Sequence, residues 1–245
     1  MLQFLDGLFR PNDFPDYPNA LNGLQVEGPD EVRRLGAAVD ASERTILEAR
    51  TRGVDFLLVH HGLFWNGLGP LAGPRFRKVV ALIEGRIALY SLHLPLDAHP
   101  TLGNGAILGG ELGVELEEGF AAFEGVEVGW WGHLVTDRET LQSDLADLVE
   151  GPVQLIPGGP REIRKVGILT GSGAGALREA ASLGLDALVT GEAAHHNYHD
   201  AMELGVNLFL AGHYATEVFG VKALADHVAA EFGIPWEFLH FPTGL

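Results

Sequence analysis

Residues 53–59 read Gly-Val-Asp-Phe-Leu-Leu-Val, and His60 and His61 follow directly. Residues 54–59, which are apolar except for Asp55, are typical of a strand buried on both faces, as in a parallel sheet. Residues 35–39 predict a second buried strand. Residues 42–52 between the two predict a helix, with Ser42 as its N-cap and Gly53 as its stop signal. This part of the chain therefore predicts a strand–helix–strand unit.

The same alternation continues outward in both directions. Residues 75–84 predict a helix and residues 87–92 a third strand, which runs into His93 and Asp97. Farther along, the apolar runs predict a second set of strands and helices. Its strands cover 165–170, 186–190 and 206–210, and its helices cover 174–183, 198–204 and a segment from His213 through Phe232.

The second set resembles the first closely enough to indicate an internal duplication of β-α-β-α-β units. Residues 184–190 read Gly-Leu-Asp-Ala-Leu-Val-Thr, so Asp186 lies 131 residues after Asp55. His93 and Asp97 have the same spacing as His213 and Glu217, 120 residues later. The alternative is that all parallel α/β sequences look alike. The repetition of ionisable residues favours duplication.

We predict an α/β fold of two internally repeated, mostly parallel α/β units with a short inserted α+β segment. Residues 1–114 form the first repeat and residues 161–245 the second. Residues 115–160 form an inserted subdomain with its own strand (126–135), its own helix (138–148) and an exit rich in proline and glycine.

Composition limits the functions open to this chain. It has 245 residues, 16 basic and 33 acidic, for a formal net charge of −17. Such a surface repels phosphate backbones, which argues against nucleic acid as a partner. The absence of cysteine leaves imidazole and carboxylate as metal ligands. We see no secretory signal and no membrane-length apolar run, and expect a cytoplasmic protein.

His60 and His61 are the first candidate ligands. They follow a predicted strand, and ligands of parallel sheets collect beyond the carboxyl ends of the strands. Gly62 allows the backbone turn that would let both imidazoles reach one metal. The alternative is one buried, hydrogen-bonded histidine and one exposed histidine.

Two further pairs follow strand ends. His213 and Glu217 would lie one turn apart on a helix, where they could bind a cation or form a simple surface pair. Pro95 disfavours helical geometry at the residue before it, so we expect Asp97 in a loop or at a helix N-terminus, where it could also be a bare N-cap. His93 would be a ligand or a hydrogen-bond partner of one.

Together these regions supply three or more imidazoles and two carboxylates. That is too many ligands for one tetrahedral zinc ion and suits two metals about 3.5–4 Å apart, bridged by carboxylate and water. Asp97 and Glu217 are the natural bridging groups. The site would hold two divalent ions per chain, with iron, manganese, zinc, cobalt and nickel all compatible.

A glycine-rich loop offers a competing interpretation. Residues 171–176 fit G-x-G-x-x-[GA], and Glu192 lies 21 residues after Gly171, as in a dinucleotide-binding fingerprint. The loop could instead cradle an anion at a helix N-terminus, or form a tight turn without a ligand. Glu192 and His196 could line the same crevice as the metal ligands. Five other histidines belong to no group of candidate ligands in the sequence and are interpreted as structural or surface residues: His99, His133, His199, His227 and His240.

The chain resembles the Nif-three-like dinuclear metal-centre proteins, often labelled GTP cyclohydrolase I type 2 homologues. The resemblance covers nearly the whole chain and rests on these blocks: Asn22-Gly23-Leu24-Gln25-Val26, Val59-His60-His61-Gly62, His93 through Asp97, Gly103-Asn104, Gly171-Ser172-Gly173, Thr190-Gly191-Glu192 with His195-His196, and Gly212-His213-Tyr214-x-Thr216-Glu217.

The resemblance implies that His60, His61, Asp97, His213 and Glu217 are metal ligands. It also implies a homohexamer built as a pair of trimers, with the metal sites facing an internal cavity. Two positions depart from the family's pattern. Glu192 stands where aspartate is expected, and His199 stands where a small residue is usual.

Three functions compete at this point. The first is a metal-dependent hydrolase acting on a small molecule such as a nucleotide, by GTP cyclohydrolase-like ring opening or phosphoester hydrolysis. His93, Glu192 and His196 would then be catalytic residues that move protons. The second is a metal-binding regulatory or interaction protein without turnover. The third, from the glycine-rich loop, is a nicotinamide-dependent dehydrogenase.

Overall fold

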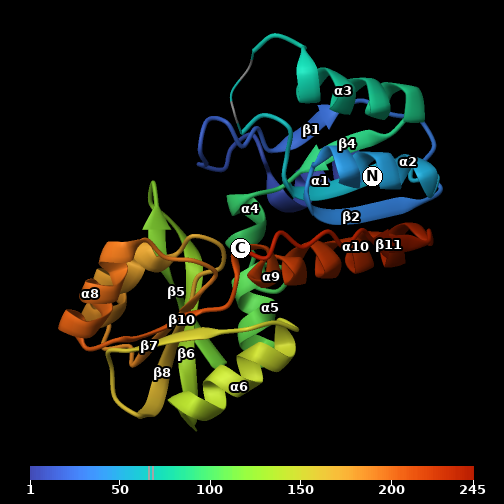
Figure 1. Ribbon diagram of the computed structural model, residues 1–245. Helices are drawn as coiled ribbons and strands as arrows, with labels where there is room; N and C mark the ends of the chain where they lie inside the picture. The colour runs from blue at the N-terminus through green and yellow to red at the C-terminus, as the bar shows by residue number, and fades with distance from the viewer. Residues whose placement is uncertain (66, 68) are drawn as a thin grey trace. The chain divides into compact units, whose positions relative to one another are not determined.

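The computed structural model describes residues 1–65, 67 and 69–245, which divide into two compact units (Figure 1). Unit 1 comprises residues 1–96 and 220–241, and unit 2 comprises residues 97–219 and 242–245. In the described part of the chain, no helix has both the length and the apolar character needed to cross a membrane.

Unit 1 contains a five-stranded sheet in the order β1-β4-β3-β2-β11. The predicted strands are β2 (Leu35–Asp40), β3 (Phe56–His61) and β4 (Ala88–Ser91), and they run parallel. β11 (Trp236–Phe238) continues the parallel arrangement, and β1 (Gly23–Val26) is an antiparallel edge strand. His60 and His61 are the last two residues of β3 rather than the residues after it.

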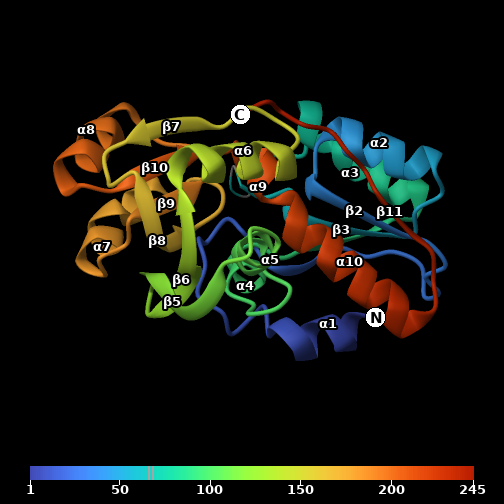
Figure 2. The ribbon, with the colours of Figure 1, turned by 90° about the horizontal axis from the view of Figure 1, so that it is seen from below.

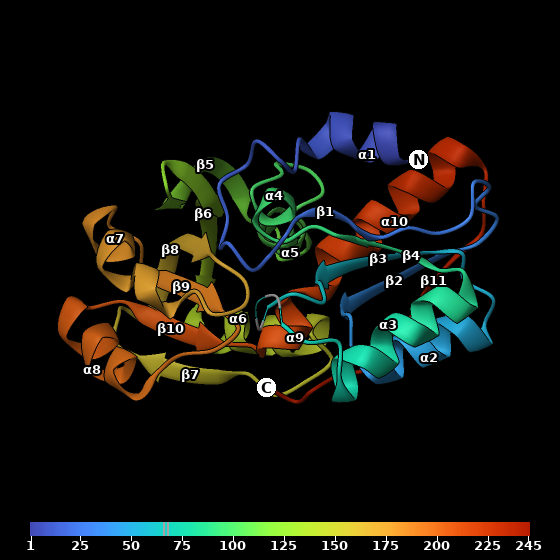
Figure 3. The same cartoon turned by 90° about the horizontal axis from the view of Figure 1, so that it is seen from above.

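Helices cover both faces of this sheet. Figure 3 shows α2 (Glu43–Thr51) and α3 (Gly73–Gly85) on one face and α1 (Leu2–Phe9) and α10 (Val218–Phe232) on the other. Side chains alternate between the two faces along each strand. The face toward α2 and α3 therefore buries Leu57 and Val59 against Ile46 and Leu82. Ser42 caps α2 as predicted, by accepting the Thr45 N–H at 3.0 Å.

Unit 2 contains a six-stranded sheet in the order β5-β6-β8-β9-β10-β7. The predicted strands of the second set are β8 (Glu162–Ile168), β9 (Ala187–Thr190) and β10 (Asn207–Leu210), again parallel. β5 (Glu115–Phe123) and β6 (Val126–Asp137) extend the sheet antiparallel on one side, and β7 (Gln154–Pro157) does so on the other. All three antiparallel strands come from the predicted insert.

Two hydrophobic clusters fill unit 2. They lie beneath the helices that cover the two faces of its sheet, which Figure 2 shows. One packs α5 (Asn104–Glu111) and α6 (Arg138–Leu148) against alternate strand residues. The other packs α7 (Leu177–Ser182) and α8 (His195–Leu204), with the short 3-10 turn η1 (Ala174–Ala176) leading into α7. The predicted α/β class, with parallel strands in both sheets, is confirmed.

The two sheets repeat one topology. In each, three parallel strands are joined by helices, and the strand that precedes them lies antiparallel beside the third. The contacts repeat as well. Asp55 Oδ2 accepts two backbone N–H groups at the start of β2, at 2.8 and 3.1 Å. Asp186, its counterpart 131 residues later, accepts the corresponding two N–H groups of β8, at 2.8 and 3.0 Å. These observations support the internal duplication.

The compact units do not follow the predicted boundaries at residues 114 and 160. The segment after β4, which carries α5, packs in unit 2, whereas most of α10, which follows β10, packs in unit 1. The two repeats therefore exchange the helices that follow their third strands. The division into residues 1–114, 115–160 and 161–245 stays a prediction about how the chain is repeated.

Asp55→Ala and Asp186→Ala should destabilise the protein by similar amounts, about 1–3 kcal/mol each, because each leaves two backbone N–H groups without their carboxylate acceptor. Urea denaturation followed by circular dichroism measures the change. Asp144→Ala, an exposed position on α6, is the control and should stay within about 0.5 kcal/mol of the parent. Two aspartate variants that behave like the control would contradict the shared role.

Candidate metal centre

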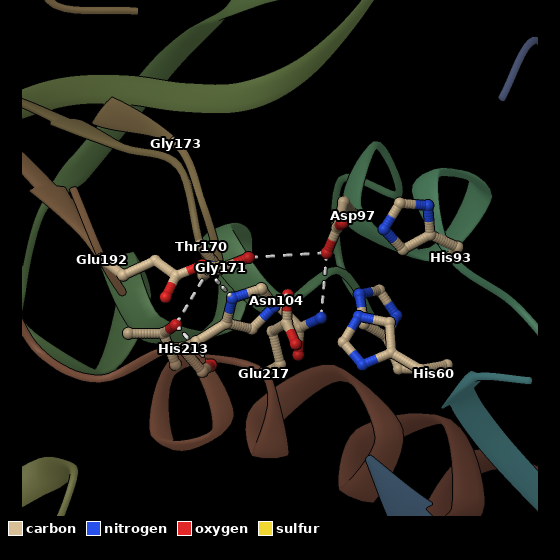
Figure 4. Close-up of polar contacts among 12 residues, drawn as sticks. His60, His93, Asp97, Asn104, Thr170, Gly171, Gly173, Glu192, His213 and Glu217 are labelled. Carbon is tan, nitrogen blue, oxygen red and sulfur yellow. Dashed lines mark hydrogen bonds and ion pairs between the residues drawn. The ribbon is translucent and has the colours of Figure 1, made fainter. Parts of the chain in front are cut away.

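Three histidines gather at one end of the unit 1 sheet. His60 and His61 end β3, and His93 follows the neighbouring parallel strand β4, so their side chains meet at the same sheet edge. The ring centre of His60 lies 4.8 Å from that of His61 and 4.9 Å from that of His93. One nitrogen from each ring lies within 4.8 Å of the other two. Figure 4 shows His60 and His93 in this group.

An oxygen atom holds the Nδ1 of every ring in this group. The Leu92 carbonyl oxygen lies 2.8 Å from His60 Nδ1. Asp40 Oδ1 lies 2.9 Å from His61 Nδ1, and Asp16 Oδ1 lies 2.9 Å from His93 Nδ1. An acceptor at Nδ1 puts the proton on that nitrogen and the coordinating lone pair on Nε2. All three rings therefore have Nε2 as the nitrogen that can coordinate a metal.

Asp16 and Asp40 are the residues that sequence reasoning missed. Asp16 is buried and also accepts the Asn22 amide at 2.8 Å and the Leu94 N–H at 3.0 Å. Burial raises the pKa of Asp16, but its hydrogen bond to His93 and these further donors outweigh burial and hold the pKa below its ordinary value. Asp40 is paired with His61 in the β2–β3 register. Its place at the end of a predicted strand was an available signal, whereas nothing distinguished Asp16.

Unit 2 presents a second group, built on α9 (His213–Thr216). Glu217 follows this single helical turn, and its Oε1 lies 3.2 Å from His213 Nε2. Glu192 Oε1 lies 2.9 Å from His213 Nδ1. The hydrogen bond to Glu217 is the largest cause that raises the pKa of His213, and burial acts in the opposite direction. With the added effect of the charges of both carboxylates, the pKa rises to about 9. Glu217 itself is buried.

Asp97 lies in the same unit, at the end of α4 (Leu94–Asp97). Asp97 lies in the first turn of this four-residue helix, as one of the two predicted alternatives allows, but Leu94 before Pro95 is itself helical, contrary to expectation. The Leu94 N–H donates to Asp16, which satisfies the start of the turn, and proline is readily accepted in a first helical turn. His93-x-x-x-Asp97 and His213-x-x-x-Glu217 thus both span one short helical turn. Asp97 is buried, and its Oδ1 accepts the Asn104 amide at 2.9 Å and faces the Thr170 hydroxyl at 3.5 Å (Figure 4).

The glycine-rich loop packs directly against this group. The Gly171 N–H donates to Thr216 Oγ1 at 3.1 Å, and the Gly173 N–H donates to Thr190 Oγ1 at 2.9 Å. A Cβ at Gly171 would collide with Glu217 Oε1 and come within 3.2 Å of His213 Nε2. Because both glycine N–H groups are used internally, the loop fits a tight structural turn better than a dinucleotide fingerprint or an anion cradle.

The other predicted catalytic residues differ in their surroundings. His93 belongs to the unit 1 group, and Glu192 contacts His213. His196 is exposed on α8, and no hydrogen bond or ring contact within the described residues joins it to either of these groups. Its role as a proton carrier stays a prediction.

Comparison with known proteins places this arrangement in a family. The family model described as Duf34/NIF3 (NGG1p interacting factor 3) matches residues 1–243. The chain belongs to the Duf34/NIF3 family. The predicted resemblance is thereby confirmed, since this is the family whose blocks the sequence displays.

Other Duf34/NIF3 proteins are similar over their full length. A protein of Deinococcus radiodurans named GTP cyclohydrolase 1 type 2 homolog is 45% identical, covering 100% of this chain and 93% of the relative. One of the same name from Archaeoglobus fulgidus is 40% identical, covering 100% and 98%. The crystal structure of TTHA1606 from Thermus thermophilus superimposes with a TM-score of 0.90 at 42% identity, covering 100% of this chain and 98% of that one.

Gly171→Ala should lower metal affinity by about 10–100-fold, because the new Cβ displaces the carboxylate of Glu217 and disturbs His213. Titration of the metal-free protein with Zn²⁺ measures this loss. Gly184→Ala is a matched control, since Gly184 also has a positive φ (69° against 63°) but a Cβ there meets nothing within 4 Å. Equal losses in both variants would show that backbone strain, and not Glu217, is responsible.

Glu192→Gln should lower the pKa of His213 from about 9, because the imidazolium loses one of its two carboxylate partners. An NMR titration of the metal-free protein follows the His213 ring, with Glu203→Gln on α8 as the control. The folded-state pKa lies above the ordinary 6.5, so protonated His213 stabilises the metal-free protein below about pH 6.5, and this contribution is lost as the pH rises through about 9. An unchanged midpoint in Glu192→Gln would contradict the assignment.

Proposed function

We propose that this protein is a metal-dependent hydrolase that holds a pair of divalent cations. His60 and His61 would supply imidazoles from unit 1. Asp97, His213 and Glu217 would supply two carboxylates and an imidazole from unit 2. Such a donor set of nitrogen and carboxylate oxygen suits iron, manganese, zinc, cobalt and nickel.

The observation that carries this proposal is the state of the four histidines. Each has an oxygen acceptor at Nδ1, from a carboxylate in three cases and a backbone carbonyl in the fourth. Metal-bound histidines almost always show this arrangement, because the acceptor orients the ring and strengthens Nε2 as a ligand. That all four rings share it supports metal binding over four unrelated structural roles.

Two bound cations would polarise the scissile group and make water nucleophilic near neutral pH. The side chains around them would move protons. Buried Asp16 lies 2.9 Å from His93 Nδ1 and orients the ring. Glu192 orients His213 and is half-exposed, so it can exchange protons with solvent. His213 must lose its own proton before it can act as a ligand, so metal uptake at neutral pH releases a proton.

The substrate we propose is a nucleotide. The Deinococcus and Archaeoglobus relatives carry the name GTP cyclohydrolase 1 type 2 homolog, which suggests ring opening of a guanine nucleotide by water. Phosphoester hydrolysis would use the same centre. We further propose a homohexamer, a pair of trimers, on the family resemblance.

A second function has an observation of its own. The family description names an interacting factor, so a metal-binding regulatory protein without turnover is the alternative. The two functions share the metal centre and differ only in whether a nucleotide is consumed.

Elemental analysis of the purified protein should find about two metal ions per chain. His61→Ala should lose metal and any nucleotide turnover, and Asp40→Asn should weaken metal affinity by about 10–100-fold through the orientation of His61. His133→Ala is the control, because His133 is half-exposed and contacts Glu117 in unit 2.

The readout combines metal content with turnover of a nucleotide and phosphoester panel. A metal-loaded protein that consumes nothing in the panel would favour the regulatory function. A protein that takes up no metal, or a His61→Ala variant that keeps the full complement, would overturn the metal centre.

A further inference from the structure

Helix α8 of unit 2 (Figure 1) carries a second set of histidines. His195 and His199 are both exposed and lie four residues apart, which places them on one face of the helix one turn apart. His196 is equally exposed but lies about 100° around the helix axis from His195. His196 can therefore serve as a control for His195 and His199, because it is equally exposed on the same helix but points in a different direction.

The geometry of the two facing rings is close to that of a chelate. The ring centres of His195 and His199 are 5.8 Å apart, and their planes are nearly perpendicular at 83°. Two imidazoles that share a cation at about 2.0–2.1 Å place their ring centres roughly 5 Å apart. A small rotation of exposed side chains closes the difference.

The ring nitrogens of this pair are also available. Among the described residues, no hydrogen bond or ion pair engages His195 or His199, whose ring neighbours are each other and Tyr198. Two other polar side chains of α8 have partners: Asp200 pairs with Arg178 at 3.0 Å, and Asn197 accepts the Ala194 N–H at 2.9 Å. The histidine pair thus contrasts with the four rings of the metal centre, whose Nδ1 atoms are already held.

We propose that His195 and His199 form a separate surface site for a borderline divalent cation such as Cu²⁺, Ni²⁺ or Zn²⁺. Two histidines at this spacing on one helical face are a recognised arrangement for binding metal. Water fills the remaining coordination positions, so the site is weaker and more exchangeable than one with four protein ligands. The proposal adds a role to His199, which the sequence alone indicates only as a structural or surface residue.

Cu²⁺-nitrilotriacetate is the probe that isolates this site in the full-length protein. The chelator occupies most of the metal's coordination positions, so binding requires two accessible imidazoles and cannot draw on buried carboxylates. We expect one probe per chain, with two coordinated imidazoles detected by electron paramagnetic resonance. His195→Ala and His199→Ala should each weaken binding about tenfold or more, because the second imidazole binds intramolecularly.

His196→Ala is the matched control and should retain the probe, since it removes an exposed histidine from the same helix but not from the same face. His213→Ala, which disables the proposed metal centre, should also retain it, so the two proposals fail separately. Binding that survives both His195→Ala and His199→Ala, or that falls equally in His196→Ala, would overturn the surface site.

Discussion

The hydrogen bond at the Nδ1 of each imidazole is the constraint on which the candidate centre depends. An imidazole offers a metal only one lone pair, and the neighbouring oxygen decides which nitrogen carries it. Here Asp16, Asp40 and Glu192 decide it, together with the Leu92 carbonyl. Asp16 lies in the N-terminal loop, Asp40 ends β2, and Glu192 and Leu92 follow β9 and β4. The tautomers are therefore set by the whole fold rather than by any short motif.

The repeated architecture explains why similar chemistry occurs at two places in one chain. In each repeat a histidine follows the third parallel strand, and a single helical turn then leads to a carboxylate. Asp55 and Asp186 fix the start of the first strand in the same way in both sheets. What differs is the surroundings: His93 faces the buried carboxylate of Asp16, whereas His213 lies between Glu192 and Glu217. The two halves thus share a topology and differ in the side chains that surround their histidines.

The sequence predicts the strands and helices well because their apolar runs are long and their stop signals clear. It also points to His60, His61, His213 and Glu217, since each lies at or just after a strand end. Asp16 escapes prediction because it lies in an N-terminal loop with no periodic pattern, and its role exists only through tertiary contact. Helical geometry at Leu94 is not predicted, because a residue before proline usually avoids it. Here the Asp16 carboxylate accepts the Leu94 N–H and outweighs that preference. The exchange of α5 and α10 cannot be predicted from the local sequence pattern. Hydrophobic periodicity shows which face of a helix is buried, but it does not show which sheet that face packs against.

That exchange bears on the order in which the protein assembles during its synthesis. Unit 2 is almost entirely contiguous, from residue 97 to residue 219, and needs only the last four residues to complete it. Unit 1 begins first along the chain, yet one face of its sheet is covered by α10 and its edge is closed by β11, both near the C-terminus. During synthesis, strands β1 to β4 leave the ribosome well before α10 and β11. In that interval their apolar side chains lack the elements that cover them in the folded protein, so this sheet is exposed to aggregation longer than the contiguous sheet of unit 2.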